Sequence, residues 1–360
     1  MEVLSQYFEE TPTNFSQLKK QLNEKNIIIK ENTNLGLFLL KYNKELCEMT
    51  DPLVQQCRGL VGRIDNLSLV CLPPIKSEKL EQFTNNINWE DIEIEEFVDG
   101  TMINMFYYNE EWLISTRSKI GANCRWIGKK NFDILFSESN GDLDWDLLDK
   151  QCYYTFVLTH PENRIVKEYS EPSLVLVQVG RVLDGKNELL ELRDQNIGIP
   201  TPTTYNINNL NEAIVFTNNQ TYDFQGLVLK NGNRRSKIRN AKYNYARSLK
   251  SNTNNLCFLY FYLKKNMFDY DYLKFYPEHK EYFEKYNNNF EDLVTRVFEN
   301  YKNYHMMKKI SIQDMPFRLR PLCYEIHGIY LSRKENITPE HVKNYLVSLP
   351  IPRILFSLKI

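Results

Sequence analysis

The spacing of apolar residues changes once along the chain. Up to about residue 245, apolar residues come in short runs separated by polar turns, which is typical of β-strands. Beyond that point they recur every third or fourth position, as on an amphipathic helix, most clearly at Phe290, Leu293, Val294, Val297, Phe298, Tyr301 and Tyr304. The sequence therefore predicts two domains, a strand-rich one over 1–245 and a helical one over 246–360.

The pattern also predicts individual elements. Strands are expected at 27–29, 37–42, 56–63, 67–72, 153–158, 165–166, 174–183 and 225–230. Helices are expected at 14–24, 208–216 and 322–331, and a helical or irregular region should follow Ala122 up to about residue 150. Thr338 followed by Pro339 predicts the start of a further helix, because threonine caps helices and proline fits their first position.

The stretch from Glu95 to Ala122 organises the first domain. It reads as a strand that ends in a Val-Asp-Gly-Thr turn, a second strand, a polar kink and a third strand. A turn containing Asp99 and Gly100 can present a carboxylate and a bare backbone to a phosphate or a sugar. The same dipeptide is also common in ordinary hairpins, so both interpretations are open at this point.

Composition limits the class of protein. The chain has 360 residues, of which 42% are hydrophobic and 13% aromatic, and this content excludes a disordered protein. The formal net charge is −1, so no overall field attracts nucleic acid or a membrane. Seven cysteines without a CxxC pair and five dispersed histidines argue against a disulfide framework or a zinc site.

The same composition gives an expectation for the compartment. We find no signal peptide and no apolar run of the roughly 20 residues that span a bilayer. We therefore expect a cytoplasmic protein in a reducing compartment, with no membrane partner. Asn, Lys, Ile and Tyr are abundant and Gly is sparse, which indicates an AT-rich genome, viral or cellular.

Charge is segregated locally in two windows. Residues 224–268 and 112–132 contain no Asp or Glu but many Lys and Arg. Such windows are either solvated faces or phosphate-binding surfaces. Lys237 and Arg239 would share one face of a strand, where two cations can bind one polyphosphate. Tyr243 and Tyr245 could stack on bases or belong to the core.

Seven short motifs then occur in an order that resembles the phage-type RNA ligase family (RNA ligase 1-like). They are Cys57-Arg58-Gly59-Leu60-Val61, Lys79, Val98-Asp99-Gly100-Thr101, Ser115 to Lys119, Pro161-Glu162-Asn163-Arg164-Ile165-Val166, Gln225-Gly226-Leu227-Val228 and Lys237-Ile238-Arg239. The resemblance covers roughly residues 50–245. Members of this family are covalent nucleotidyltransferases.

The resemblance implies a fold and a chemistry. The fold is α+β, a nucleotidyltransferase (ATP-grasp-like RNA/DNA ligase) fold of two packed antiparallel sheets with flanking helices, here followed by an all-helical C-terminal domain. In the family, a lysine two residues before the Asp-Gly pair attacks the α-phosphate of ATP. The AMP then passes to an RNA 5′-phosphate and is displaced by a 3′-hydroxyl. Implied cofactors are ATP, or GTP, and Mg²⁺ if the protein is active.

The resemblance also implies site residues. Nucleotide-binding positions are expected at Arg58, Phe97, Asp99, Gly100, Val157, Gln225, Gly226, Lys237 and Arg239. Positions for RNA contact are expected at Arg117, Arg125, Arg234, Arg235, Lys242 and Arg247. No metal ligands are predicted.

Four of these positions depart from the family pattern. Phe97 stands where the family has its nucleophilic lysine, and a phenyl ring cannot form a phosphoramidate. Val157 and Gln225 stand where the family has glutamates, which removes charge that would hold a metal. Arg239 replaces a lysine and keeps its charge.

Three hypotheses follow. In the first, the chain is a pseudo-enzyme that binds nucleotide and RNA ends and has lost its ligase chemistry. In the second, it is an active ATP-dependent RNA ligase whose nucleophile has moved to Lys119 on the neighbouring strand or to Lys79. In the third, it is a structural protein that inherited the fold. A protein partner could bind the helical domain. His160 could be an acid–base group or a hydrogen-bonding residue, and Glu162 could replace the carboxylate missing at Val157 or be a solvated loop residue.

Overall fold

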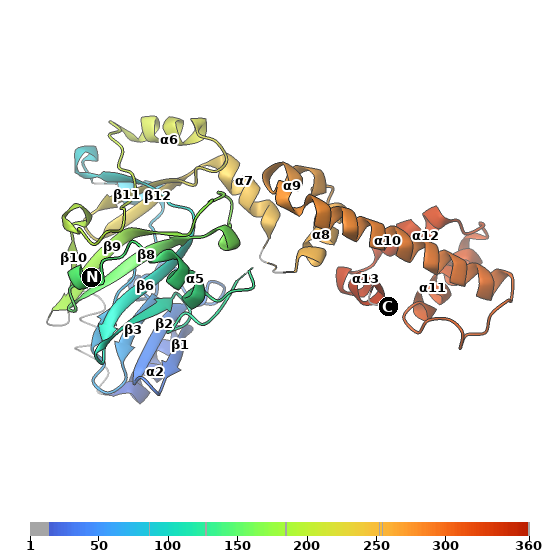
Figure 1. Cartoon of the computed structure of the whole chain (residues 1–360), viewed down its shortest axis with the longest axis horizontal. Helices are drawn as coiled ribbons and strands as arrows, with labels where there is room; N and C mark the ends of the chain where they lie inside the picture. Colours follow the sequence, from blue (N-terminus) through green and yellow to red (C-terminus); the bar gives the residue numbers. More distant parts are fainter. Residues whose placement is uncertain are drawn as a thin grey trace. The chain divides into compact units, whose positions relative to one another are not determined.

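The computed structural model describes residues 14–85, 87–126, 128–183, 186–251, 253 and 255–358. Contacts divide the chain into two compact units, Met1–Tyr245 and Ala246–Ile360. No helix among these described residues is long and apolar enough to cross a bilayer. The first unit contains the sheets and the second is helical, each shown in Figure 1 by its colours.

Twelve strands form three antiparallel sheets in the described part of the first unit. The four-stranded sheet contains β1 (Ile27–Asn32), β2 (Leu37–Tyr42), β3 (Arg58–Arg63) and β4 (Leu69–Cys71) in that order. The five-stranded sheet has the order β10 (Lys186–Leu190), β9 (Ser173–Leu183), β8 (Cys152–Thr159), β6 (Thr101–Tyr108) and β7 (Glu111–Thr116). The three-stranded sheet has the order β12 (Arg234–Arg239), β11 (Gly226–Asn231) and β5 (Glu93–Glu96).

Helices cover these sheets within the first unit. They are α2 (Phe15–Glu24), α3 (Pro52–Gln56), α4 (Leu80–Thr84), α5 (Phe132–Ser139) and α6 (Leu210–Asn219). Helix α2 begins where the Asn14 side chain accepts a hydrogen bond from the Gln17 amide, which satisfies one of the first-turn donors. In Figure 1, α6 lies over β11 and β12.

The three-stranded sheet has one apolar face. Leu227, Leu229 and Ile238 are buried on this face and pack with Phe83 of α4 and Ala213 of α6. Burying one such side chain stabilises the fold by about 1.5–3 kcal/mol, so the two helices hold this sheet from one side. Its other face is therefore available for polar residues.

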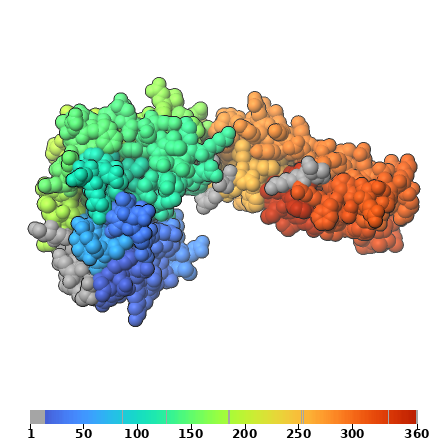
Figure 2. Space-filling view, turned by 60° about the horizontal axis from the view of Figure 1, so that its bottom comes forward, coloured from blue at the N-terminus to red at the C-terminus, as the bar shows by residue number. Residues whose placement is uncertain are grey.

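The four-stranded and five-stranded sheets share a core. Leu22 of α2 and Leu40 of β2 belong to the same buried cluster as Phe106 of β6 and Tyr153 of β8. Figure 2 shows the blue N-terminal segments packed against segments from the middle of the chain. The opposite face of the five-stranded sheet packs against α5 through residues such as Phe156.

The fold class predicted from the sequence is confirmed, with a more detailed arrangement of sheets. The strands predicted at 37–42, 56–63, 67–72, 153–158, 174–183 and 225–230 appear within two residues of their expected limits, and so does the helix at 14–24. Strand β1 ends three residues beyond the predicted 27–29, and α6 ends three residues beyond the predicted 208–216. The four-stranded sheet is a separate third sheet. Residues 52–56 form α3, so the strand predicted from Gln56 begins two residues later.

One local expectation was wrong. Residues 165–166 form bends instead of a strand, because the amide of Val166 donates to the Asp99 side chain instead of joining a sheet. Of the two interpretations left open for the Val-Asp-Gly-Thr segment, the ordinary hairpin turn does not hold. The segment joins β5 of the three-stranded sheet to β6 of the five-stranded sheet, so it crosses from one sheet to the other.

The second unit is helical, as the change in apolar spacing predicted. It begins within α7 (Ala241–Lys250). After α7 come α8 (Leu256–Lys265), α9 (Asp269–Phe275), α10 (Lys280–Tyr301), a π-helical turn over Lys302–Met306, α11 (Arg320–Arg333), α12 (Pro339–Ser348) and α13 (Ile351–Leu358). The predicted cap is confirmed, because the Thr338 hydroxyl accepts a hydrogen bond from the amide of His341.

Gly226, at the start of β11, requires glycine. Its φ is +140°, a conformation that other residues rarely adopt, and a Cβ there would collide with the carbonyl oxygen of Ile238. We expect Gly226→Ala to lower the free energy of unfolding by at least about 1–3 kcal/mol, as measured by denaturant titration. Gly141→Ala is the control, since its Cβ would meet open space. Equal stability of the two variants would contradict this explanation.

Candidate functional site

The polar face of the three-stranded sheet carries the candidate site. The register pairs Gly226 with Arg239, Val228 with Lys237, and Lys230 with Arg235, so these residues share the face opposite the apolar core. The Lys230 amine donates to the carbonyl of Val177 in β9, at 3.4 Å. This surface, which we call the cleft face, therefore looks toward the five-stranded sheet.

Phe97 lies under two cations of the cleft face. The Lys237 Nζ is 5.5 Å from the centroid of the Phe97 ring, and the Arg239 Cζ is 5.2 Å from it. Both distances allow cation–π attraction, which holds the charged groups over the ring. The predicted convergence of Lys237 and Arg239 on one face is confirmed by this arrangement.

Asp99 is buried and accepts three hydrogen bonds through its carboxylate. Oδ2 accepts from the amides of Val166 (2.9 Å) and Lys167 (2.8 Å), and Oδ1 accepts from the Tyr243 hydroxyl (2.7 Å). The Asp99 carbonyl also accepts from the Tyr169 hydroxyl, at 2.8 Å. Burial, and then the charge of Asp99, raises the pKa of Tyr169, so this hydroxyl stays a donor. Asp99 thus fixes the crossover, the segment that leads from the three-stranded to the five-stranded sheet, because it accepts hydrogen bonds from residues far away in the sequence.

The positions around this crossover are tightly packed. A Cβ on Gly100 would overlap the carbonyl oxygen of Leu158 and a methyl of Val157, so the crossover fits closely over β8. Val157 and Gln225 are buried, with 9% and 6% exposure. The two positions where the resemblance implies carboxylates therefore hold an apolar side chain and a neutral amide.

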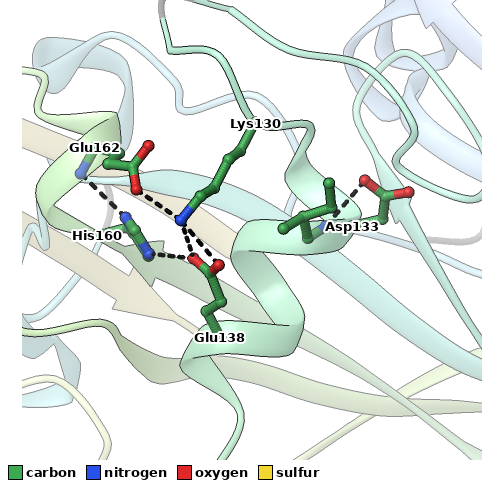
Figure 3. Close-up of polar contacts among 6 residues, drawn as sticks. Lys130, Asp133, Glu138, His160 and Glu162 are labelled. Carbon is green, nitrogen blue, oxygen red and sulfur yellow. Dashed lines mark hydrogen bonds and ion pairs between the residues drawn. The ribbon is translucent and has the colours of Figure 1, made fainter.

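A network of charged residues supports the loop that follows β8 (Figure 3). The Lys130 amine contacts Glu138 of α5 at 2.8 Å and Glu162 at 2.6 Å. The His160 Nδ1 accepts from the Glu162 amide at 3.0 Å, so its Nε2 carries the proton and donates to Glu138 at 2.9 Å. In the same loop, the Asn163 side chain donates to the Thr101 hydroxyl.

This network decides between the two interpretations of His160 and Glu162. His160 is 4% exposed and both of its ring nitrogens are engaged, so it positions the loop as a hydrogen-bonding residue. Glu162 pairs with Lys130 near the surface. It therefore does not replace the carboxylate missing at Val157.

The two candidate nucleophiles lie outside regular strands. Lys119 was expected on a strand, but β7 ends at Thr116, and Lys119 is exposed on the following bend with its amine donating to the carbonyl of Asn123. Lys79 is also exposed, at the N-cap of α4. The amine that lies over the Phe97 ring is that of Lys237.

The six residues expected to contact RNA are spread over several elements. Arg117 lies over the ring of Tyr42, at 5.5 Å, and Arg125 is exposed in the loop before α5. Lys242 and Arg247 lie on α7, where the Lys242 amine donates to the carbonyl of Gln220.

Arg234 and Arg235 are adjacent in sequence but lie on opposite faces of β12. Arg234 forms a bidentate ion pair with Glu78, at 2.6 and 2.9 Å, outside the cleft face. Arg235 lies on the cleft face opposite Lys230. Strand alternation explains this separation.

The sequence did not show which residues are the hydroxyl partners of Asp99. Tyr169 and Tyr243 are 70 and 144 residues from Asp99, and no local pattern marks a distant hydroxyl as its partner. Tyr243 is fully buried and therefore belongs to the core, whereas Tyr245 is 43% exposed.

The described residues do not provide a metal centre. No three of their His, Cys, Asp and Glu side chains come together in a group that could hold an ion. Because Val157 and Gln225 supply no carboxylate, the site does not fit the Mg²⁺ that the family resemblance implies.

We expect the protein to lose stability when the acceptor oxygens of Asp99 are changed. Asp99→Asn places an NH₂ group against amide or hydroxyl donors and should lower the free energy of unfolding by about 1–3 kcal/mol. Tyr243→Phe removes one of these bonds and should cost about 1 kcal/mol. Denaturant titration measures both. An Asp99→Asn variant as stable as the unmodified protein would show that the crossover does not depend on this carboxylate.

The loop network predicts a pH dependence. Hydrogen bonds from Lys130, and then from His160, lower the pKa of Glu138. The ionised Glu138 carboxylate therefore stabilises the folded protein at neutral pH, and this stabilisation is lost as the pH falls through the lowered pKa. Glu138→Gln removes this titration. We expect the stability difference between the two proteins to shrink from pH 6 toward pH 3, and a constant difference would contradict the assignment.

Comparison with known proteins gives partial matches. No family model matches the chain. The chain is 26% identical over 163 residues to a protein provisionally named a bifunctional polynucleotide kinase/RNA ligase, from Autographa californica nuclear polyhedrosis virus, covering 40% of this chain and 24% of that protein. It is 24% identical over 317 residues to an immediate-early protein ICP-46 homolog of Invertebrate iridescent virus 6, and the match covers 79% of this chain and 70% of that protein.

A solved archaeal ATP-dependent RNA ligase gives a TM-score of 0.47 at 13% identity, covering 71% of this chain and 67% of that one. A score of this size carries no weight for the site. The chain spans about a quarter of the viral kinase/ligase, so the activity of that whole protein does not transfer to it. Over part of its length the chain is therefore similar in sequence to viral proteins, one of which is named as a polynucleotide kinase/RNA ligase.

Proposed function

We propose that this protein binds a nucleotide, and the 5′-phosphate end of an RNA, on the cleft face without forming a covalent lysyl–AMP. The nucleotide's phosphates would lie against Lys237 and Arg239. The protein would then act as a pseudo-enzyme, holding ligands that related proteins transform.

One observation carries this proposal. At the position where the resemblance implies an attacking amine, Phe97 presents a ring beneath two retained cations, Lys237 and Arg239. Keeping a pair of cations on one strand face favours phosphate binding, since charge-assisted contacts to phosphate are among the stronger polar interactions. Replacing the amine with a phenyl ring removes the nucleophile, because carbon and hydrogen atoms of the ring cannot attack a phosphate.

The ligand classes follow from the same residues and from the relatives. ATP is the first candidate because the resemblance is to ATP-dependent ligases, and GTP is the second. RNA ends are proposed because a viral relative is named as a polynucleotide kinase/RNA ligase. Binding should not require Mg²⁺, since the two positions for ligating carboxylates hold Val157 and Gln225.

The second candidate function is ATP-dependent RNA ligation or nucleotidyl transfer with a relocated lysine. The placement of the Lys237 amine 5.5 Å from the Phe97 ring keeps this candidate open, because an amine is present beside the vacated position. Lys119 and Lys79 are the candidates from the sequence, and both would have to reach the cleft from exposed positions.

Covalent chemistry and binding can be separated in one experiment. The protein is incubated with α-labelled ATP or GTP and a divalent metal, and intact mass spectrometry reports any lysine–nucleotide adduct. We expect no adduct. Fluorescence anisotropy with labelled nucleotide and with 5′-phosphorylated RNA should show binding that weakens at least about 10-fold in the Lys237→Ala/Arg239→Ala double variant, since each cation contributes a charge-assisted contact.

The control double variant is Lys20→Ala/Lys30→Ala, which removes the same charge from α2 and β1. It should bind as tightly as the unmodified protein. An adduct that disappears on Lys119→Ala, Lys79→Ala or Lys237→Ala would replace the binding proposal with the relocated-nucleophile function. Absence of both adduct and binding would leave a structural protein.

A further inference from the structure

A pair of stacked histidines joins two elements of the second unit. His305 lies in the π-helical turn Lys302–Met306 at the end of α10, and His327 lies on α11. The centroids of the two imidazole rings are 4.0 Å apart, and the ring planes are 19° from parallel. The rings therefore lie face to face. This contact, which we call the histidine pair, holds the end of α10 against α11.

The backbone departs from an α-helix where the pair forms. The amide of Met307 donates to the carbonyl of Lys302 at 2.9 Å, which is the five-residue hydrogen bond of a π-helix. Such turns are rare and occur frequently at functional sites. Because the π-helical turn contains His305, a movement of this ring would disturb the hydrogen bond of the Met307 amide.

Each ring has one nitrogen that the fold shields but does not satisfy. The Nε2 of His305 and the Nδ1 of His327 are hidden from solvent and have no hydrogen-bond partner among the described residues. A neutral imidazole donates from one nitrogen, whereas a protonated imidazole donates from both. Protonation of His305 would therefore make its shielded Nε2 a charged donor without an acceptor, which destabilises the closed arrangement.

Titratable groups face the pair from each element packed against it. They are Tyr301 and Tyr304 from α10 and the π-helical turn, Tyr324 and Tyr330 from α11, and Lys308 from the segment that follows the turn. Burial, then the charge of His327 and then that of Lys308 lower the pKa of His305 from 6.5 to about 4. The surroundings therefore favour the neutral His305 ring.

The pair is not arranged to hold a metal ion. The lone pair of an imidazole nitrogen lies in the plane of its ring, so near-parallel planes direct two such lone pairs past one another instead of toward one ion. No group of three His, Cys, Asp or Glu side chains among the described residues includes these histidines. A response to protons is the chemistry that this geometry supports.

We propose that the histidine pair is a pH-sensitive latch, which keeps the end of α10 closed against α11 while His305 is neutral and releases it when His305 takes up a proton. Opening would carry the His305 ring into water and break the π-helical turn. It would also uncover Tyr301, which is 2% exposed in the closed form and belongs to the core of this unit. This inference concerns the second unit and is independent of the proposed function.

The direction of the response follows from the difference between the two forms. A free imidazole titrates near pH 6.5, and the closed form lowers the pKa of His305 to about 4. Between these values the open form binds the proton and the closed form does not, so the closed form loses stability as the pH falls from 6.5 toward 4. The ratio of open to closed form rises by at most about 10-fold for each pH unit in this window.

The test measures hydrogen exchange of the Met307 amide by NMR in the full chain at pH 6.5 and pH 4.5, corrected for the intrinsic exchange rate at each pH. We expect the protection factor of this amide to fall by at least about 10-fold in the unmodified protein, within the ceiling of about 100-fold for two pH units. In His305→Phe, a ring that does not titrate fills the same place, so the protection factor should change by less than about twofold.

His341→Gln is the matched control. His341 belongs to the same unit but lies outside the pair, where its side chain completes the capping box of α12 with Thr338. Glutamine is a usual residue at this position of a capping box, so the variant should fold normally and keep the response of the Met307 amide to pH. The imidazole signals of the unmodified protein, followed by NMR, should show that His305 stays neutral down to about pH 5.

Three results would overturn the latch. Titration of His305 near pH 6.5 would show that the closed form does not resist protonation. A protection factor of the Met307 amide that is equal at both pH values, or that falls equally in His305→Phe, would show that the end of α10 does not respond through this ring. An equal loss of protection over the whole second unit would show general acid unfolding instead of a local opening. Should His305→Phe not fold, His305→Gln tests the same point, and the imidazole titration of the unmodified protein decides without any variant.

Discussion

The hydrogen bonds accepted by Asp99 are the interaction on which the rest of the site depends. Segments far apart in the sequence meet at this one residue, through the amides of Val166 and Lys167 and the hydroxyls of Tyr169 and Tyr243. They anchor the chain where it leaves the three-stranded sheet and enters the five-stranded one. The position of Phe97, two residues earlier, follows from this anchor.

The cleft face combines a lost reactive group with retained charge. In the nucleotidyltransferases that the chain resembles, cations around the nucleophile serve both binding and reaction. Here Lys237 and Arg239 lie over a phenyl ring, and Val157 and Gln225 stand where the resemblance implies carboxylates. In the proposed function the kept cations bind phosphate, and the changed positions are those where the resemblance implies the covalent step. This division favours a binding role for the site.

Sequence patterns predicted what depends on local periodicity. Alternation along a strand placed Lys237 and Arg239 together, and the same rule separates Arg234 from Arg235, although both had been grouped as RNA contacts. The change to helical spacing predicted the second unit. The order of short motifs predicted the fold class, because the spacing of these motifs reflects the order of strands around the site.

What the sequence left undetermined depends on contacts between distant segments. An ordinary hairpin stayed open at the Asp-Gly turn because nothing local shows that β5 and β6 pair with different strands. Residues 165–166 resembled a strand because their apolar character hides a hydrogen bond to Asp99. Arg235 resembled its neighbours in sequence, and only the strand register shows that it lies across from Lys230 on the cleft face.

The most direct test of the central claim is a crystal structure of the protein soaked with a nucleotide. The account predicts a non-covalent nucleotide whose phosphate lies within hydrogen-bond distance of Lys237 and Arg239, beside the Phe97 ring. A nucleotide covalently joined to any lysine, or one bound away from the cleft face, would contradict it.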